Sequence, residues 1–285
     1  MINQNLMQNN LIVTGADGRI GRALRAVWGG QVAGRRVLWS ARRPGQGIDI
    51  PWNMGVEAAP ALPSGSILLN LAGQTRGDAS QLAENRRAAA ALGRAACQAG
   101  VVHVFHMSSA AIYRPEAALI AEDTPPDPIS DYGHAKWAAE QAMSETLHGC
   151  GLTILRLGNL AGADALLTSA RNGPVALDPI SGQPGGPERS YIGPNVLAAT
   201  LTHLIMQAIA GAPMPAILNL AQHPALPMAD LLMACGADWR FGKPRPAAIP
   251  RVALSLARLQ ACASVPSATA VSIVADLVSL RGRWP

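Results

Sequence analysis

Short apolar runs alternate with longer amphipathic stretches from residue 11 to about residue 220 of the chain. Branched aliphatic runs that end in glycine or asparagine are typical of buried strands, and apolar residues three and four apart are typical of helices. Strands are expected at 11–13, 37–39, 67–71, 101–107, 153–157 and 216–220, and helices at 20–28, 81–99, 131–147 and 194–210. This βαβ alternation predicts an α/β fold, a doubly wound parallel sheet with helices on both faces.

The pattern changes after Gly158. Residues 171–195 are rich in glycine and proline and are expected to form a long loop, and short helices punctuated by proline follow from residue 222. An amphipathic segment over 268–280 closes the chain. We therefore expect one domain from 1–170, rejoined by about 194–221, and a small second region made of 171–193 and 222–285.

The turn between the first strand and the first helix carries Gly15, Gly18 and Gly21, each three residues apart. The first glycine permits the turn, the second lets backbone amides approach a pyrophosphate, and the third allows the helix to pack on the strand. The helix N-terminus, at Arg19 and Ile20, supplies positive potential. The turn therefore predicts a dinucleotide site. The alternative is a glycine turn with a purely structural role.

The end of the second strand bears on the choice between NAD and NADP. An acidic residue there would bind the ribose 2′-hydroxyl, but the chain reads Trp39-Ser40-Ala41-Arg42-Arg43. The two arginines suit a 2′-phosphate, which favours NADP over NAD. Asp49 and Ile50 follow and are expected near the adenine. The alternatives are that the arginines are only solvated and that Asp49 caps a turn.

A serine pair and a tyrosine–lysine pair carry the candidate chemistry. Ser108 and Ser109 close an apolar run, and Tyr132 and Lys136 lie four residues apart, on one face of a helix. Lys136 is one of two lysines in a chain with twenty-one arginines. A tyrosine has a pKa of about 10, and a neighbouring ammonium lowers the pKa of its phenol toward that of a general base. The alternative is an amphipathic tyrosine beside a solvated lysine.

These elements in this order resemble the extended short-chain dehydrogenase/reductases, also known as NAD-dependent epimerase/dehydratases. The resemblance also rests on Asn70-Leu71-Ala72-Gly73, Asn85, Glu122-Asp123 and Arg156-Leu157-Gly158-Asn159. It implies a dinucleotide-binding Rossmann domain with a small C-terminal cap, formed by 171–193 and 222–285, that binds the substrate. It implies that Ser109, Tyr132 and Lys136 are catalytic, with Ser109 rather than Ser108 as the serine because it directly precedes Ala110-Ala111-Ile112-Tyr113.

The resemblance also assigns binding residues. The expected cofactor contacts are Gly15, Gly18, Arg19, Ile20, Gly21, Arg42, Asp49, Ile50, Leu71, Ala72, Gly73, Asn85, Ser108, Tyr132 and Lys136. Asn159 and Arg189 are the expected substrate contacts: Arg189 resembles a family arginine that contacts the diphosphate of a nucleotide-sugar, and Asn159 resembles an asparagine near the same ligand. The alternative for Arg189 is a surface arginine without a ligand. The segment 193–196 after Arg189 departs from the family pattern. A homodimer through helices 81–99 and 131–147 is also implied.

The implied function is that of an NAD(P)-dependent oxidoreductase or epimerase. It would act on a hydroxyl or ketone of a sugar or nucleotide-sugar-like substrate, with a hydride transferred beside Tyr132. Dehydratases of the family carry an acidic residue next to the catalytic hydroxyl, whereas Ala110 and Ala111 follow Ser109 here. The alternative is a regulatory or scaffold protein of the same fold that binds NAD(P) without turnover.

Composition excludes other classes. The net charge is +5, but no lysine cluster or arginine run with interleaved aromatics indicates nucleic acid. The four cysteines are widely spaced, and no Cys/His/carboxylate cluster has metal-ligand spacing, so no metal is expected. The sequence has no stretch of eighteen apolar residues, so a membrane span is not expected. Met1 to Asn10 does not resemble a signal peptide. A cytoplasmic protein is expected.

Overall fold

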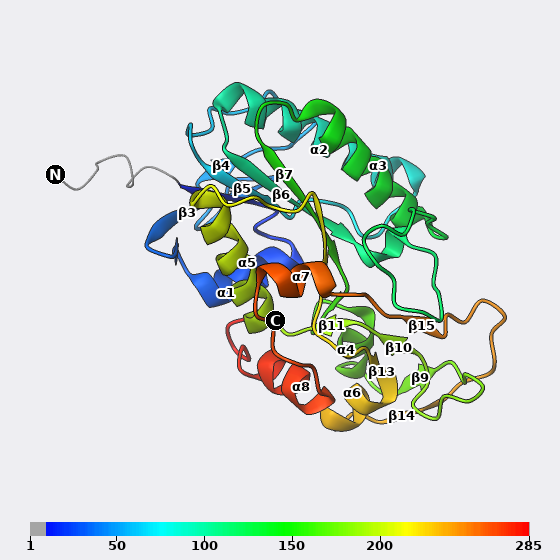
Figure 1. Ribbon diagram of the computed structural model, residues 1–285. Helices are drawn as coiled ribbons and strands as arrows, with labels where there is room; N and C mark the ends of the chain where they lie inside the picture. The colour runs from blue at the N-terminus through cyan, green and yellow to red at the C-terminus, as the bar shows by residue number, and fades with distance from the viewer. Residues whose placement is uncertain (1–9, 285) are drawn as a thin grey trace.

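An eight-stranded, mostly parallel sheet forms the centre of the computed structural model, which describes residues 10–284 (Figure 1). The strands run in the order β12-β7-β6-β5-β1-β3-β2, and β4 pairs with β3 at the edge. The strands are β1 (Leu11–Thr14), β2 (Gln31–Val32), β3 (Arg35–Ala41), β4 (Ile50–Pro51), β5 (Ile67–Asn70), β6 (His103–Ser109), β7 (Gly151–Leu157) and β12 (Ile217–Leu220). Within this sheet, as far as the structure describes it, every pairing is parallel except that of β2 with β3. The predicted α/β fold with a doubly wound parallel sheet is confirmed.

Two helical layers cover the two faces of this sheet. Helices α2 (Ala79–Ala99) and α3 (Asp131–Thr146) lie against one face, and α1 (Arg19–Trp28) and α5 (Pro194–Ile209) lie against the other (Figure 1). The core is divided in the same way, because alternate strand residues enter separate buried clusters on the two faces. The carboxyl ends of the parallel strands are left free to build a site.

Local capping determines where the two helices above the sheet begin. Asp78 accepts a hydrogen bond from the Gln81 amide while the Gln81 side chain accepts from the Asp78 amide, so α2 starts two residues before the predicted position. Gly100 ends α2 in the left-handed conformation. Ser130 accepts from the Gly133 amide and starts α3 one turn before Lys136.

The region predicted to be a long loop contains strands. Its elements are β9 (Val175–Leu177), β10 (Glu188–Arg189) and β11 (Tyr191–Ile192), and α5 already begins at Pro194. Each short strand pairs with a distant partner. Strand β9 pairs with β14 (Trp239–Phe241), and β11 pairs with β8 (Asn159–Leu160). Strand β10 lies between β13 (Leu226–Pro227) and β15 (Arg251–Val252) and pairs with both. Such pairing is invisible to local periodicity, so the loop prediction is wrong for these residues.

The cap is completed by four short helices near the carboxyl ends of the sheet. They are α4 (Ala165–Ala170), α6 (Met228–Ala234), α7 (Ala257–Cys262) and α8 (Ala270–Val278). The Asp276 carboxylate on α8 accepts from the backbone amides of Asn195 and Val196 at the start of α5. This contact stabilises the positive end of α5 and fixes the end of the chain to the main domain.

A buried ion pair joins β7 to α3 behind the site. The Arg156 guanidinium donates to both carboxylate oxygens of Glu140, at 3.0 and 3.3 Å, and to the Tyr113 hydroxyl at 2.9 Å. Arg156 and Glu140 are almost completely buried. Loss of one partner would leave an uncompensated buried charge, so this pair is expected to fix α3 against the sheet.

A polar row crosses the carboxyl ends of three neighbouring strands. Thr14 donates to the Asn70 Oδ1 atom at 2.6 Å, and the Asn70 Nδ2 atom lies 2.8 Å from His106 Nδ1. The Asn70 Oδ1 atom also accepts from the Ala72 amide, which fixes the amide orientation and makes His106 Nδ1 the acceptor. Burial lowers the pKa of His106 to about 3, and the nearby Lys136 charge contributes to the same shift.

Acid is therefore expected to destabilise the protein through His106. Below pH 6.5 the unfolded chain gains a proton that the folded chain does not, so the free energy of unfolding falls by roughly 3 kcal/mol between pH 6.5 and pH 4. Denaturant titrations at several pH values should show a smaller acid loss in His106→Gln than in the wild type. His134→Gln, on an exposed face of α3, is the control, and equal acid loss in both variants would contradict the prediction.

Among residues 10–284, no helix combines the length and apolar character needed to cross a membrane. The prediction about a signal peptide concerns Met1 to Asn10, and residues 1–9 of that segment lie outside the described part of the chain.

Candidate active site

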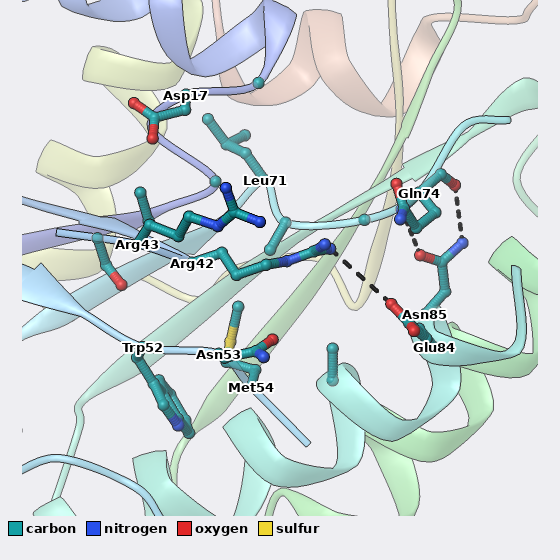
Figure 2. A pocket seen from close by; sticks show the side chains of 17 residues that line it. Asp17, Arg42, Arg43, Trp52, Asn53, Met54, Leu71, Gln74, Glu84 and Asn85 are labelled. Atoms are coloured by element: carbon teal, nitrogen blue, oxygen red, sulfur yellow. Dashed lines mark hydrogen bonds and ion pairs between the residues drawn. The ribbon is translucent and has the colours of Figure 1, made fainter. Parts of the chain in front are cut away.

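A cavity of about 410 Å³ opens at the carboxyl ends of β1, β3 and β5, beside the start of α2 (Figure 2). It is lined by Gly15, Asp17, Gly18, Ser40, Ala41, Arg42, Arg43, Trp52, Asn53, Met54, Leu71, Ala72, Gly73, Gln74, Glu84, Asn85 and Ala88. The cavity therefore brings together the glycine turn, the end of β3 and the predicted Leu71–Gly73 segment. A cavity of this size is in the range of small-molecule and cofactor sites.

The three glycines of the turn serve different purposes. Gly15 has a φ of +70°, and a Cβ there would lie 2.7 Å from the Ala72 amide nitrogen. A Cβ on Gly21 would lie 2.2 Å from the Gly15 carbonyl oxygen, so both positions are required by packing. At Gly18 the backbone is unstrained and the nearest atom to a Cβ is the Gly15 oxygen, at 3.1 Å. Gly18 lines the cavity, and its missing side chain leaves the backbone open to a ligand.

The first turn of α1 is open to an anion. Within the described residues no side chain caps this helix and its first turn holds no acidic residue. Its free amides and its dipole favour a negatively charged group, which is what a dinucleotide pyrophosphate presents. Arg19, at the first position of the helix, donates instead to the Ala163 carbonyl oxygen at 2.6 Å and so connects the turn to the cap.

Asp49 and Ile50, the residues predicted near the adenine, do not line the cavity. The Asp49 carboxylate accepts from the Arg36 guanidinium at 2.6 Å and from the Trp39 amide at 3.0 Å. The segment after β4 lines the cavity with Trp52, Asn53 and Met54 in place of Asp49 and Ile50. The reason is the parallel register of β3 and β4, which pairs Ser40 with Ile50 and places the residues after Pro51 at the edge of the sheet.

The sequence did not identify Trp52, Asn53, Met54 or Glu84 as residues that line the cavity. The available signal for Asn53 and Met54 was their position directly after a short strand beside β3, which local patterns do not reveal. Glu84 comes from α2 and reaches Arg42 across the cavity, with Glu84 Oε2 at 3.8 Å from Arg42 Nη2 (Figure 2). Such a contact depends on the packing of α2 and carries no local signature.

A smaller cavity of about 90 Å³ contains the candidate catalytic side chains. It is lined by Ile20, Leu71, Gly73, Gln74, Thr75, Met107, Ser108, Ser109, Tyr132, Lys136, Leu157 and Gly158. Leu71, Gly73 and Gln74 line both cavities, so the two share a wall. The structure therefore brings Ser109, Tyr132 and Lys136 together next to the larger cavity.

The hydrogen bonds around the three side chains are specific. The Ser109 hydroxyl accepts from the Ala111 amide at 3.2 Å, and it lies near enough to the Tyr132 hydroxyl to lower the pKa of the phenol. The Lys136 ammonium donates to the Met107 carbonyl oxygen at 2.5 Å. The Ser108 hydroxyl is buried and has no partner within the described residues, and Ser108 is one of the residues that line the cavity. An unpartnered buried hydroxyl at a cavity wall fits a polar ligand.

Burial dominates the titration of the site. It raises the pKa of Tyr132, and the hydrogen bond with Ser109 opposes this effect. This direction is the reverse of the lowered pKa expected from the sequence. Burial also lowers the pKa of Lys136 to about 8, while the charge of Glu140 opposes the shift. The phenol is therefore protonated at neutral pH, which suits a proton donor, and Lys136 changes charge close to the physiological range.

Asn85 fixes the wall that the two cavities share. Its side chain accepts from the Gln74 amide at 2.6 Å and donates to the Gln74 carbonyl oxygen at 2.9 Å. A Cβ on Gly73 would lie 3.2 Å from Asn85 Oδ1 and 3.7 Å from Lys136 Nζ. The wall therefore stays close to the lysine because residue 73 has no side chain.

The predicted substrate residues lie away from these cavities. Arg189 donates to the backbone oxygens of Glu188 and Ile249, and it takes part in no ion pair among residues 10–284. Burial lowers its pKa. Asn159 pairs with Tyr191 in the register of β8 and β11, and the Tyr191 hydroxyl donates to the Asp164 carboxylate at 3.4 Å. The structure does not bring Arg189 or Asn159 into the lining of either cavity described above.

A parallel sheet with an open glycine turn, and a serine, tyrosine and lysine beside it, is typical of dinucleotide-dependent α/β proteins. Residues 11–173 match the model of the NAD dependent epimerase/dehydratase family. The chain belongs to this family, as the sequence motifs predicted.

The chain resembles known proteins of this group. A stretch of 85 residues is 40% identical to a UDP-glucose 4-epimerase of Azospirillum brasilense. The matched stretch covers 29% of this chain and 24% of that relative, so the chain spans about a quarter of the length of the relative. WbmG of Bordetella bronchiseptica, solved with NAD, has a TM-score of 0.76 at 18% identity, with 98% and 96% of the two chains covered. The UDP-glucose 4-epimerase of Thermus thermophilus in complex with NAD has a TM-score of 0.73 at 21% identity, with 96% and 99% covered. These structures share the fold.

Proposed function

We propose that the protein is an NAD(P)-dependent oxidoreductase or epimerase that acts on a hydroxyl or ketone of a nucleotide-sugar-like substrate. The observation that carries the proposal is the convergence of Ser109, Tyr132 and Lys136 on one small cavity that shares a wall with the larger one. A phenol, a hydroxyl and an amine at one point are the groups that hydride transfer needs around a reacting oxygen.

The residues of the larger cavity fit a dinucleotide. Gly18 and the start of α1 would hold the pyrophosphate, and Ser40 with Arg42 and Arg43 would hold the adenosine ribose. Asn53 and Met54 would contact the adenine. The bound dinucleotide would supply and accept the hydride at the smaller cavity. Two arginines and no carboxylate at the end of β3 support NADP as the preferred form.

The chain's own residues would manage the proton. The Tyr132 hydroxyl would donate to a substrate carbonyl oxygen or accept from a carbinol, and Ser109, which lines the same cavity, would orient that oxygen. Lys136, placed one turn further along α3, would provide a positive charge that stabilises the phenolate. The partly neutral state of this buried lysine makes that assistance depend on pH.

Solved relatives support a nucleotide-sugar substrate. WbmG has been solved with NAD and UDP, and MoeE5 with UDP-glucose and NAD, at TM-scores of 0.74 and 0.72. In this chain Arg189, which has no carboxylate partner among the described residues, and Asn159 remain the proposed contacts to the diphosphate. A homodimer through α2 and α3 and a cytoplasmic location belong to the same proposal.

Mass spectrometry of the purified protein, combined with a turnover panel of nucleotide-sugars and ketones, tests the proposal. A nicotinamide dinucleotide retained by the protein would indicate internal recycling, as in an epimerase, and turnover with an exchangeable dinucleotide would indicate an oxidoreductase. Dinucleotide binding without turnover across the panel would support the alternative, a regulatory or scaffold protein.

Arg42→Ala is expected to weaken NADPH binding by about tenfold and NADH binding by less than about twofold, because a guanidinium favours a 2′-phosphate over a hydroxyl. Fluorescence titration gives both dissociation constants. Arg94→Ala removes an exposed arginine of α2 that does not line the cavity and is the control. An unchanged ratio of the two constants in Arg42→Ala would contradict the assignment of Arg42 to the 2′-position.

A further inference from the structure

The mouth of the larger cavity is bridged by charges from two different elements. Arg42 extends from the end of β3 toward Glu84 on α2, with Arg42 Nη2 at 3.8 Å from Glu84 Oε2 (Figure 2). Glu84 Oε1 lies 3.8 Å from Arg87 Nη2 on the same helix. Both Arg42 and Glu84 line the cavity, and both are substantially exposed. The guanidinium assigned to the ribose 2′-position is therefore already paired with a carboxylate.

The two remaining charged residues of the lining are Arg43 and Asp17. Arg43 also points into the cavity (Figure 2), and it forms no ion pair with any described residue. Asp17 is 3.5 Å from Arg25 and is partnered there. Two guanidinium groups thus face two carboxylates in the lining, and removal of Glu84 would leave the adenosine end with a net positive charge.

A further buried group indicates where the ribose would lie. The Ser40 hydroxyl belongs to a residue near the end of the strand that carries Arg42, is almost completely buried, and has no hydrogen-bond partner within the described chain. Ser40 lines the same cavity, so this hydroxyl lies beside the proposed position of the ribose. A ribose hydroxyl can satisfy it whether or not a 2′-phosphate is attached, so Ser40 alone does not separate the two dinucleotides.

The two dinucleotides would meet the Arg42–Glu84 pair differently. A dinucleotide with a free 2′-hydroxyl leaves the pair intact. A 2′-phosphate, with a charge near −2 at neutral pH, needs Arg42 for itself and must compete for it with the Glu84 carboxylate. The ion pair must then open, and Glu84 keeps only Arg87 as a partner.

We propose that Glu84 is a specificity-determining residue, which competes with the 2′-phosphate for Arg42 and so limits the preference for NADP over NAD. This inference rests on the proposed function, since it concerns the cofactor of the same site. Glu84 acts on the affinity for one dinucleotide relative to the other and takes no part in the chemical step.

The test is a double-mutant cycle of Glu84→Gln and Arg42→Ala, with NADPH and NADH dissociation constants measured by fluorescence titration. The ratio of the NADH constant to the NADPH constant is expected to rise by about three- to tenfold in Glu84→Gln, the size expected for the release of an exposed ion pair next to a phosphate. In the Arg42→Ala background the same substitution is expected to change this ratio by less than about twofold.

Glu145→Gln on α3 is the matched control, because it makes the same change in net charge away from this cavity. An unchanged ratio in Glu84→Gln would overturn the proposal, as would a rise that persists in full without Arg42 or that Glu145→Gln reproduces. In each of these outcomes NADH still binds, so the proposed function stands. Failure of the wild type to bind either dinucleotide would instead overturn the proposed function, and this inference with it.

Discussion

Tyr132→Phe is expected to lower kcat by about a thousandfold while the dissociation constants of NADPH and NADH change by less than about twofold. The size is typical of the loss of a positioned proton donor in the transition state. Only the hydroxyl oxygen is removed, and the ring keeps its place over the cavity wall. Steady-state kinetics with the substrate found in the turnover panel, together with fluorescence titration of the dinucleotides, measure the two effects separately.

Tyr113→Phe is the control for loss of a tyrosine hydroxyl. The Tyr113 hydroxyl is buried, donates to Asn219 and accepts from Arg156, so its removal is expected to cost about 1–2 kcal/mol of stability. Its kcat is expected to remain within about threefold of the wild-type value, because Tyr113 does not line the catalytic cavity. Wild-type kcat in Tyr132→Phe would remove the phenol from the mechanism.

The sequence was sufficient to predict the features that depend on local patterns. The alternating strands and helices, the glycine turn and the tyrosine–lysine spacing on one helix all arise from residues near one another in the chain. The start of α2 was misplaced by two residues because a side-chain cap at Asp78, and not hydrophobic periodicity, determines it.

The features that the sequence did not reveal depend on distant partners. Asn53 and Met54 reach the cavity because β4 pairs with β3, and Glu84 reaches Arg42 because α2 packs beside that strand. The short strand β9 forms only with β14, more than sixty residues away in the chain. The direction of the Tyr132 pKa shift depends on burial, which a spacing motif cannot provide.

Lys136→Met is expected to be nearly inactive and, at neutral pH, more stable than the wild type. Burial lowers the pKa of the folded lysine from 10.5 to about 8, a shift equivalent to roughly 3 kcal/mol. Below about pH 8 the folded protein carries a buried charge at this full cost. Between about pH 8 and 10.5 the unfolded chain still holds the proton that the folded chain has released, so the free energy of unfolding rises with pH.

Methionine has a similar length without the charge, and it leaves the Met107 carbonyl oxygen without its donor, which costs about 1 kcal/mol. The net gain in the free energy of unfolding at pH 7 is therefore expected to be about 1–3 kcal/mol. Denaturant titrations from pH 7 to pH 10 should show the difference between variant and wild type shrinking as the pH rises. Lys243→Met alters the only other lysine, which is exposed, and should change neither stability nor turnover.

Loss of activity together with a gain in stability would distinguish Lys136 from a structural residue. A lysine kept for packing or for its hydrogen bond to Met107 would destabilise the fold when replaced, and its replacement would leave kcat largely intact in the protein that still folds. A buried lysine that the fold carries at a cost in stability is instead typical of a functional site, where charge is placed for the reaction. A variant that is both less stable and fully active would show that the ammonium serves the fold.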